Sequence, residues 1–322
     1  MVDEPVTHNP KPPLRAFVAR LREHWNSVES YQRFAYSIGI FLVASAAFHS
    51  GVLVFTGGSL EGPVSWRKPI LFGESFGLTA VSVAWVMTFL PKRPAIGWLL
   101  MGPFGLAHLY EVSWVSVQQW RGVSSHFNFS TAFDTQAFGI AGIMIAVSAS
   151  VILSIAIWSF VRLEARPSIT WAIRLGMVLL LISQAVGFLI IQNGLTKVID
   201  PQTGQFISQS LAMASTFGAQ GSMKIPHALA LHAIQLLPLI AFLLQSPGSS
   251  EARRTQIVLM AGVGYGGIVA VTLWQTFNGL GPFDLSPSVS VLLILAAFLF
   301  LVGPLFTVQA IYRNLKAAGH FT

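Results

Sequence analysis

Long apolar runs constrain this chain more than any other feature. Each run holds about 18 or more residues with few charges, the length that an α-helix needs to cross the hydrocarbon core of a bilayer. Because hydrocarbon offers the backbone no hydrogen-bond partner, such runs must form helices or a closed barrel, and barrel strands would be shorter and would alternate. The sequence therefore predicts an all-α integral membrane protein with eight transmembrane helices, near residues 34–55, 69–90, 96–117, 138–161, 171–191, 226–244, 257–277 and 289–311.

The composition agrees with membrane insertion and limits the possible chemistry. Of the residues, 53% are hydrophobic and 10% are charged, whereas soluble domains are about 25% charged. The chain has no cysteine, which excludes Fe-S clusters, covalently attached haem and a cysteine nucleophile. A G-x-G-x-x-G motif begins at Gly262, but it lies inside an apolar run with no strand before it. No NAD site is expected there, and Gly262 and Gly266 at G-x-x-x-G spacing favour close helix packing.

The placement of basic residues predicts the orientation of the chain. With eight spans and a cytoplasmic N-terminus, only five of the 19 Lys and Arg residues lie on the outer side. Because basic residues are retained on the cytoplasmic side, both termini are expected inside, in a membrane of the bacterial cytoplasmic type. The net charge of +7 then reflects topology and attraction to the lipid bilayer, and no nucleic-acid partner is expected. The five outer basic residues are Arg67, Lys68, Arg121, Lys197 and Lys224.

Two polar tails flank the spans, at residues 1–33 and 315–322. In the first tail, apolar residues recur at helical spacing among arginines, which predicts an amphipathic helix on the membrane surface. The tail has no apolar segment typical of a cleavable signal peptide, so the first span is expected to direct insertion. The apolar residues of the amphipathic pattern are Leu14, Phe17, Val18, Leu21 and Trp25.

An internal similarity suggests a duplicated chain. Phe127 pairs with Phe283 inside an ungapped similarity, at an offset of 156 residues, and the same offset pairs Lys68 with Lys224. We interpret this as two tandem four-helix halves in parallel orientation, because each half has an even number of spans. Similar residues at helix ends, without duplication, are the alternative. The two halves are expected at residues 34–162 and 171–314.

Ionisable side chains gather in the halves of the spans that this topology places outward. An ionisable group in hydrocarbon costs at least about 2.5–3.5 kcal/mol, so these groups should face the bundle interior. In the third span His108, Glu111 and Gln118 lie at i, i+3 and i+10, close to one helix face. That face is expected to line a cavity.

The sixth span carries a second polar face. Lys224, His227 and Gln235 share one side of this helix, whereas His232 lies about 140° round it from His227. Further ionisable groups lie toward the same side of the membrane in other segments. These are His49 in the first span, Glu74 in the second, and Arg121, His126 and Asp134 around the loop after the third.

The leading hypothesis from these positions is a membrane-embedded oxidoreductase that uses haem b or a transition metal. Imidazoles on facing helices are the usual way to hold either group within a bundle. A quinone or a partner subunit is left open. The candidate ligands are His49, His108, His227 and His232, and the candidate catalytic groups are Glu111, Glu74, His126 and Asp134.

The alternative hypothesis is a proton-coupled transporter of a small polar or anionic solute. Lysines at the outer mouth would attract the solute, and His and Glu groups would relay protons. A third hypothesis is a histidine-dependent hydrolase of lipid-like substrates. Under any of these, the residues expected to bind the small-molecule substrate are Lys68, Gln118, Arg121, Lys224 and Gln235.

Overall fold

The computed structural model describes residues 13–197, 202–203, 211–245 and 249–317. Nearly all of this part of the chain is helical, which confirms the predicted all-α class. The helices are α1 (Pro13–Ser27), α2 (Ser30–Thr56), α3 (Arg67–Val86), α4 (Pro94–Trp120), α5 (Ala132–Arg162), α6 (Pro167–Leu195), α7 (Leu211–Ala214), α8 (Lys224–Leu243), α9 (Glu251–Phe277) and α10 (Pro287–Ala317). The short 3-10 helix η1 (Met87–Phe89) follows α3, and the strands β1 (Thr216–Phe217) and β2 (Gly221–Ser222) form a small antiparallel pair.

Seven helices of the described chain are long and apolar enough to cross a membrane. They are α2, α3 with η1, α5, α6, α8, α9 and α10 up to Gln309. The helix α4 is not among them, although its 27 residues are long enough, because its buried face carries His108, Glu111 and Gln118. The protein is thus an all-α membrane protein. Six of the eight predicted apolar runs lie within one helix, while run 69–90 continues from α3 through η1 to Leu90 and run 226–244 ends one residue after α8.

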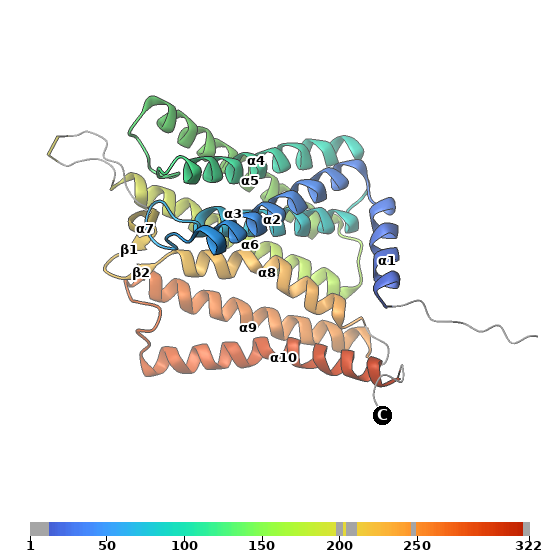
Figure 1. The fold of residues 1–322 in the computed structure, drawn as a ribbon. Helices are drawn as coiled ribbons and strands as arrows, with labels where there is room; N and C mark the ends of the chain where they lie inside the picture. The colour runs from blue at the N-terminus through green and yellow to red at the C-terminus, as the bar shows by residue number, and fades with distance from the viewer. Residues whose placement is uncertain (1–12, 198–201, 204–210, 246–248, 318–322) are drawn as a thin grey trace, which may run out of the picture.

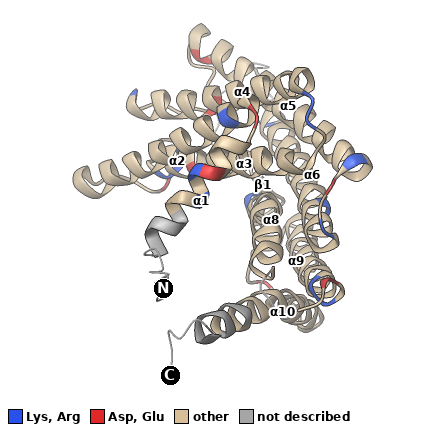
Figure 2. Ribbon diagram, turned by 90° about the vertical axis from the view of Figure 1, so that its right-hand side faces the viewer, with Lys and Arg blue, Asp and Glu red and all other residues tan. Residues whose placement is uncertain are grey.

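The spanning helices run side by side, and α1 lies across one end of the bundle (Figure 1). The described end of α10 is at this same end, and we call the opposite end the distal end. In a view along the helices, few of the residues drawn are Lys, Arg, Asp or Glu (Figure 2). The central pair is α3 and α8, which contact each other, while α3 also packs on α2 and α4, and α8 on α6 and α9.

The two central helices are also the shortest of the long helices. Both α3 and α8 have 20 residues, whereas α2, α4 and α9 have 27, α6 has 29, and α5 and α10 have 31. At about 1.5 Å per residue, the central helices are about 30 Å long and the others about 40 Å or more. Their first turns are partly covered, since Lys68 and Pro69 in α3 and Pro226 in α8 are buried, whereas Arg67 is exposed and Lys224 is half-buried.

The ends of corresponding helices match at an offset of 157 residues. Both α3 and α8 and also α4 and α9 begin at this offset and have equal lengths. The turns after α4 and α9 match as well, because Gly122 and Gly279 have φ angles of 70° and 69°. The offset of 156 found in the sequence differs by one residue from the spacing of these helix starts. At a spacing of 157 residues, Lys224 aligns with Arg67, and Ile225 aligns with Lys68.

Glycines allow the close approach of α2 and α3. A Cβ atom on Gly39 of α2 would lie 2.8 Å from the carbonyl oxygen of Gly77 in α3, so a larger side chain at either position would force the helices apart. In the G-x-G-x-x-G motif, Gly264 and Gly267 face α10. The motif thus serves packing, but Gly266 faces open space rather than another helix.

Candidate functional site

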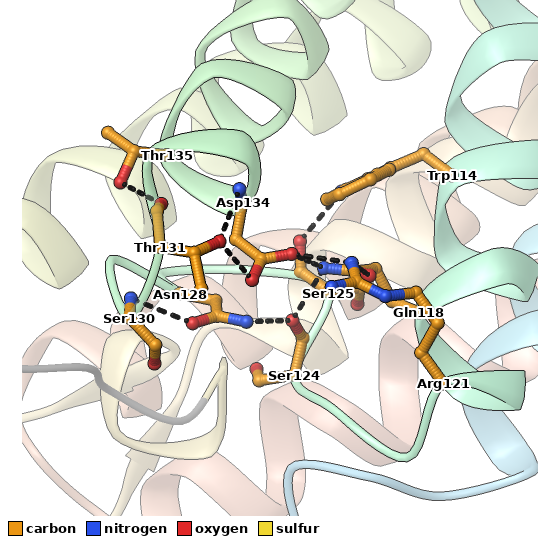
Figure 3. Close-up of polar contacts among 10 residues, drawn as sticks. All are labelled: Trp114, Gln118, Arg121, Ser124, Ser125, Asn128, Ser130, Thr131, Asp134 and Thr135. Atoms are coloured by element: carbon orange, nitrogen blue, oxygen red, sulfur yellow. Dashed lines mark hydrogen bonds and ion pairs between the residues drawn. The ribbon is translucent and has the colours of Figure 1, made fainter.

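The polar loop that joins α4 to α5 is built around one carboxylate (Figure 3). Asp134 Oδ1 accepts from Gln118 Nε2 at 2.8 Å and from Arg121 at 2.7 Å. Its Oδ2 accepts from Thr131 Oγ1 at 2.7 Å, and Thr131 caps α5 by accepting from the Asp134 backbone N–H. The carboxylate is 2% exposed and both of its oxygens are used. Gln118, Arg121 and Asp134 thus hold the loop together through hydrogen bonds to one another.

Phe127 fixes this loop to the second half of the chain. Its side chain is 1% exposed and packs with Val186 and Ile190 of α6 and with Met223. A Cβ atom at Gly194 would overlap the Phe127 ring. The ring therefore fits only because residue 194 has no side chain. Phe127 also has a φ angle of 54°, a left-handed conformation that is rare for a residue other than glycine. In the sequence, Phe127 stands out only through its pairing with Phe283. That pairing did not predict its burial, because Phe283 is 90% exposed.

Three cations meet where α3 and α8 begin, and we call Arg67, Lys68 and Lys224 the cation cluster. Lys68 lies within electrostatic reach of both other members. It is 7% exposed, and its Nζ donates to the Pro63 carbonyl at 2.7 Å. In the described part of the chain, no acidic side chain forms an ion pair with the cluster. The three ion pairs there are Lys92–Glu29, Arg121–Asp134 and Arg254–Glu251.

This arrangement is electrostatically unfavourable without a negative charge. Like charges repel, and burial of Lys68 removes part of the water that would screen them. The first turns of α3 and α8 add positive partial charge, because the backbone N–H groups of a helix start have no partner within the helix. An anion between the two helix starts would offset both effects.

His126 lies beside the cation cluster in the loop after α4. Its ring contacts Phe72 of α3 and Phe138 of α5, with centroid distances of 5.3 and 6.0 Å. Burial and the positive charges of Lys68 and Lys224 lower the pKa of His126 from 6.5 to about 3. His126 is therefore neutral at pH 7 and can donate or accept a hydrogen bond without adding charge.

The lowered pKa of His126 predicts a loss of stability in mild acid. The unfolded chain binds this proton below about pH 6.5 and the folded chain only near pH 3, so the stability contribution is complete above pH 6.5 and declines as the pH falls. Between pH 7 and pH 5 the expected loss is about 1–2 kcal/mol. Melting temperatures of the wild type and of His126→Gln in detergent measure it. Equal losses in the two proteins would contradict the assignment to His126.

His49 is fully hydrogen-bonded and has no free ring nitrogen. Its Nδ1 donates to the Ser45 carbonyl at 2.8 Å, and its Nε2 accepts from Trp120 Nε1 at 3.2 Å. Trp66 completes the surrounding aromatic group, with its ring 5.1 Å from that of Trp120. A metal or haem iron would have to displace the Trp120 hydrogen bond, so His49 fits a structural role better than a ligand role.

His108 and Glu111 are both buried on one face of α4, as predicted from their spacing. His108 is 2% exposed, its Nδ1 donates to the Phe104 carbonyl at 2.7 Å, and its ring is enclosed by Phe76 and Phe104. Glu111 is 1% exposed, and its Oε1 has no hydrogen-bond partner in the described chain. Glu111 is therefore the buried acidic group whose hydrogen-bonding capacity remains unused.

The remaining candidates are spread over α3 and α8. His227 Nδ1 donates to the Ser183 carbonyl of α6 at 2.9 Å. His232 and Gln235 are half-buried further along α8, and Glu74 is exposed on α3. Within the described ranges, no group of three His, Asp or Glu side chains is placed to hold a metal ion. The structure thus does not bring the four candidate histidines together as one ligand set.

The fold and this site define a class of protein, an all-α membrane protein whose two central helices begin with positive side chains that have no ion-pair partner among the described residues. Comparisons with protein-family models, curated proteins and solved structures gave no match to the chain. The function must therefore be argued from the site itself.

Proposed function

We propose that this protein is a carrier that binds a small anion between the starts of α3 and α8, on the outer side of a bacterial cytoplasmic membrane. The observation that carries the proposal is the cation cluster, which has three positive charges and no ion-pair partner in the described chain. Lysine and arginine side chains together with helix starts are the usual means of holding carboxylate, phosphate or sulfate groups.

The dimensions of the central helices support a carrier. In many transporters, unusually short segments at corresponding positions of two repeats point to the substrate site. Here α3 and α8 are the two short helices, and the cation cluster lies at their starts. This proposal includes α4 as an eighth span, two tandem halves, and both termini in the cytoplasm, which the predominance of basic residues on that side supports.

A matching pair of close contacts further supports duplication of the halves. Gly39 of α2 packs on Gly77 of α3, and Gly176 of α6 packs on Ile234 of α8. Gly77 and Ile234 are related by the offset of 157 residues that relates the starts of α3 and α8. Because a close helix crossing needs a small residue at one fixed position, its recurrence is more specific than a similarity of composition.

The oxidoreductase and hydrolase hypotheses have less support than the carrier. A haem or transition metal needs imidazoles with free nitrogens and space beside them, and neither His49 nor His108 offers both. Within the described ranges, no group of three His, Asp or Glu side chains is placed to hold a metal ion, and the two hydrogen bonds of His49 weigh against iron ligation there. A hydrolase would need a nucleophile beside a free histidine. The Ser183 hydroxyl lies 3.1 Å from His227 Nδ1, but it donates to the His227 carbonyl, and Nδ1 is shared with the Ser183 carbonyl at 2.9 Å.

Anion-dependent stabilisation tests the proposal. The purified protein is heated in sulfate, nitrate, phosphate or acetate, against a bulky sulfonate at equal ionic strength. At a concentration of about 100 times Kd, a bound anion should stabilise the fold by about 2.7 kcal/mol and raise Tm in a saturable manner. Uptake of the same anion into proteoliposomes then tests transport. The proposal is overturned if no anion acts beyond ionic strength, or if binding occurs without uptake.

A further inference from the structure

The carboxyl group of Glu111 is buried in α4 without a polar partner among the described residues. An ionised carboxylate without a hydrogen bond or a counter-ion is strongly disfavoured in a buried membrane position. Glu111 is 1% exposed, its Oε1 has no hydrogen-bond partner, and no ion pair in the described chain includes it. The ionised form of this carboxyl group is therefore disfavoured, and a further negative charge in the nearby site would disfavour it more.

The other titratable groups on elements packed against α4 are already engaged. On α2, His49 uses both ring nitrogens. On α5, Asp134 is bonded to Arg121, and on α3 the Glu74 side chain is exposed. On α4 itself, His108 donates to a backbone carbonyl. Lys68, Lys224 and His126 belong to the anion site, and none of them is hydrogen-bonded to Glu111 in the described structure.

A column of rings links the level of Glu111 to the cation cluster. His126 contacts Phe72, Phe72 stacks on Phe76 with centroids 5.7 Å apart, and Phe76 contacts His108 at 4.9 Å. Glu111 is three residues further along α4 than His108, toward the distal end, which is a rise of about 4.5 Å. Glu111 thus lies between the level of His108 and that of the anion site.

We propose that Glu111 binds one proton for each anion that occupies the cation cluster, so that anion and proton are taken up together. This inference rests on the proposed anion site. An anion and an ionised Glu111 would repel each other in a region with little water, so each disfavours the other. Protonation forms one O–H bond from the carboxylate and a solvent proton, and no electrons are transferred. By linkage, the proton and the anion then raise each other's affinity equally.

The test uses full-length protein with sulfate and nitrate, whose charges do not change between about pH 5.5 and about pH 8. Wild-type affinity should fall at least about tenfold over this range, and a weakly buffered solution should lose about one proton per anion bound. Glu111→Gln, which mimics the protonated form, should bind with a nearly pH-independent affinity close to that of the wild type in acid. Glu74→Gln is the matched control, since its carboxyl is exposed, and it should behave as the wild type.

His126 is the competing proton acceptor, and His126→Gln should retain the pH dependence. A pH dependence that persists in Glu111→Gln, or a pH-independent wild type without proton uptake, overturns the inference but leaves the anion site intact. Absence of anion binding at every pH overturns the proposed function instead. If Glu111→Gln does not fold, proton uptake by the wild type and by His126→Gln still decides, because uptake that vanishes in His126→Gln would exclude Glu111.

Discussion

Lys68→Gln is expected to weaken anion binding by about 30- to 100-fold, which corresponds to about 2–3 kcal/mol. Lys68 is the most buried member of the cation cluster, and its Nζ makes one hydrogen bond, to the Pro63 carbonyl. Its other N–H groups are available to an anion. Loss of a buried charged donor costs more than loss of an exposed one, because little water can replace it.

The same substitution should stabilise the anion-free protein. Lys68 lies within electrostatic reach of Lys224 and Arg67, and none of the ion pairs in the described ranges includes it, so its removal relieves repulsion. A residue that served only the fold would show the opposite result. Anion titrations and melting temperatures measure both effects, and Lys92→Gln is a control because Lys92 pairs with Glu29 away from the cluster. Weaker binding together with a lower Tm in the absence of anion would contradict a ligand-binding role for Lys68.

Phe127→Ala is expected to destabilise the fold by about 3–5 kcal/mol, the usual cost of removing a buried aromatic side chain. The Phe127 ring fills a socket over Gly194 and packs on Val186, Ile190 and Met223. The loop carries His126, so its release should also weaken anion binding. Thermal unfolding in detergent measures the first effect, and anion titration measures the second.

Phe283→Ala is the matched control for this prediction. Phe283 is the residue that sequence similarity pairs with Phe127, but it is 90% exposed. Its removal should change stability by less than about 0.5 kcal/mol. Equal effects of the two substitutions would show that Phe127 does not fix the loop to α6.

The sequence by itself determined the class of fold and the faces of the helices. Apolar runs of about 18 or more residues leave the backbone no alternative to helix in hydrocarbon. Helical periodicity placed His108, Glu111 and Gln118 on one face, and all three are buried in the structure. These properties depend on local sequence, which is why they could be predicted.

Only the tertiary structure decided which polar groups meet. Asp134 was a candidate catalytic group and His49 a candidate metal ligand. In the structure Asp134 accepts a hydrogen bond from Arg121, and His49 accepts one from Trp120. The cation cluster forms because α3 and α8 pack with their starts together, although these starts are far apart in the chain. Such contacts depend on the rotation and crossing of helices, and a shift of one residue turns a side chain about 100° round its helix. One sequence carries the period of each helix but not the register between helices.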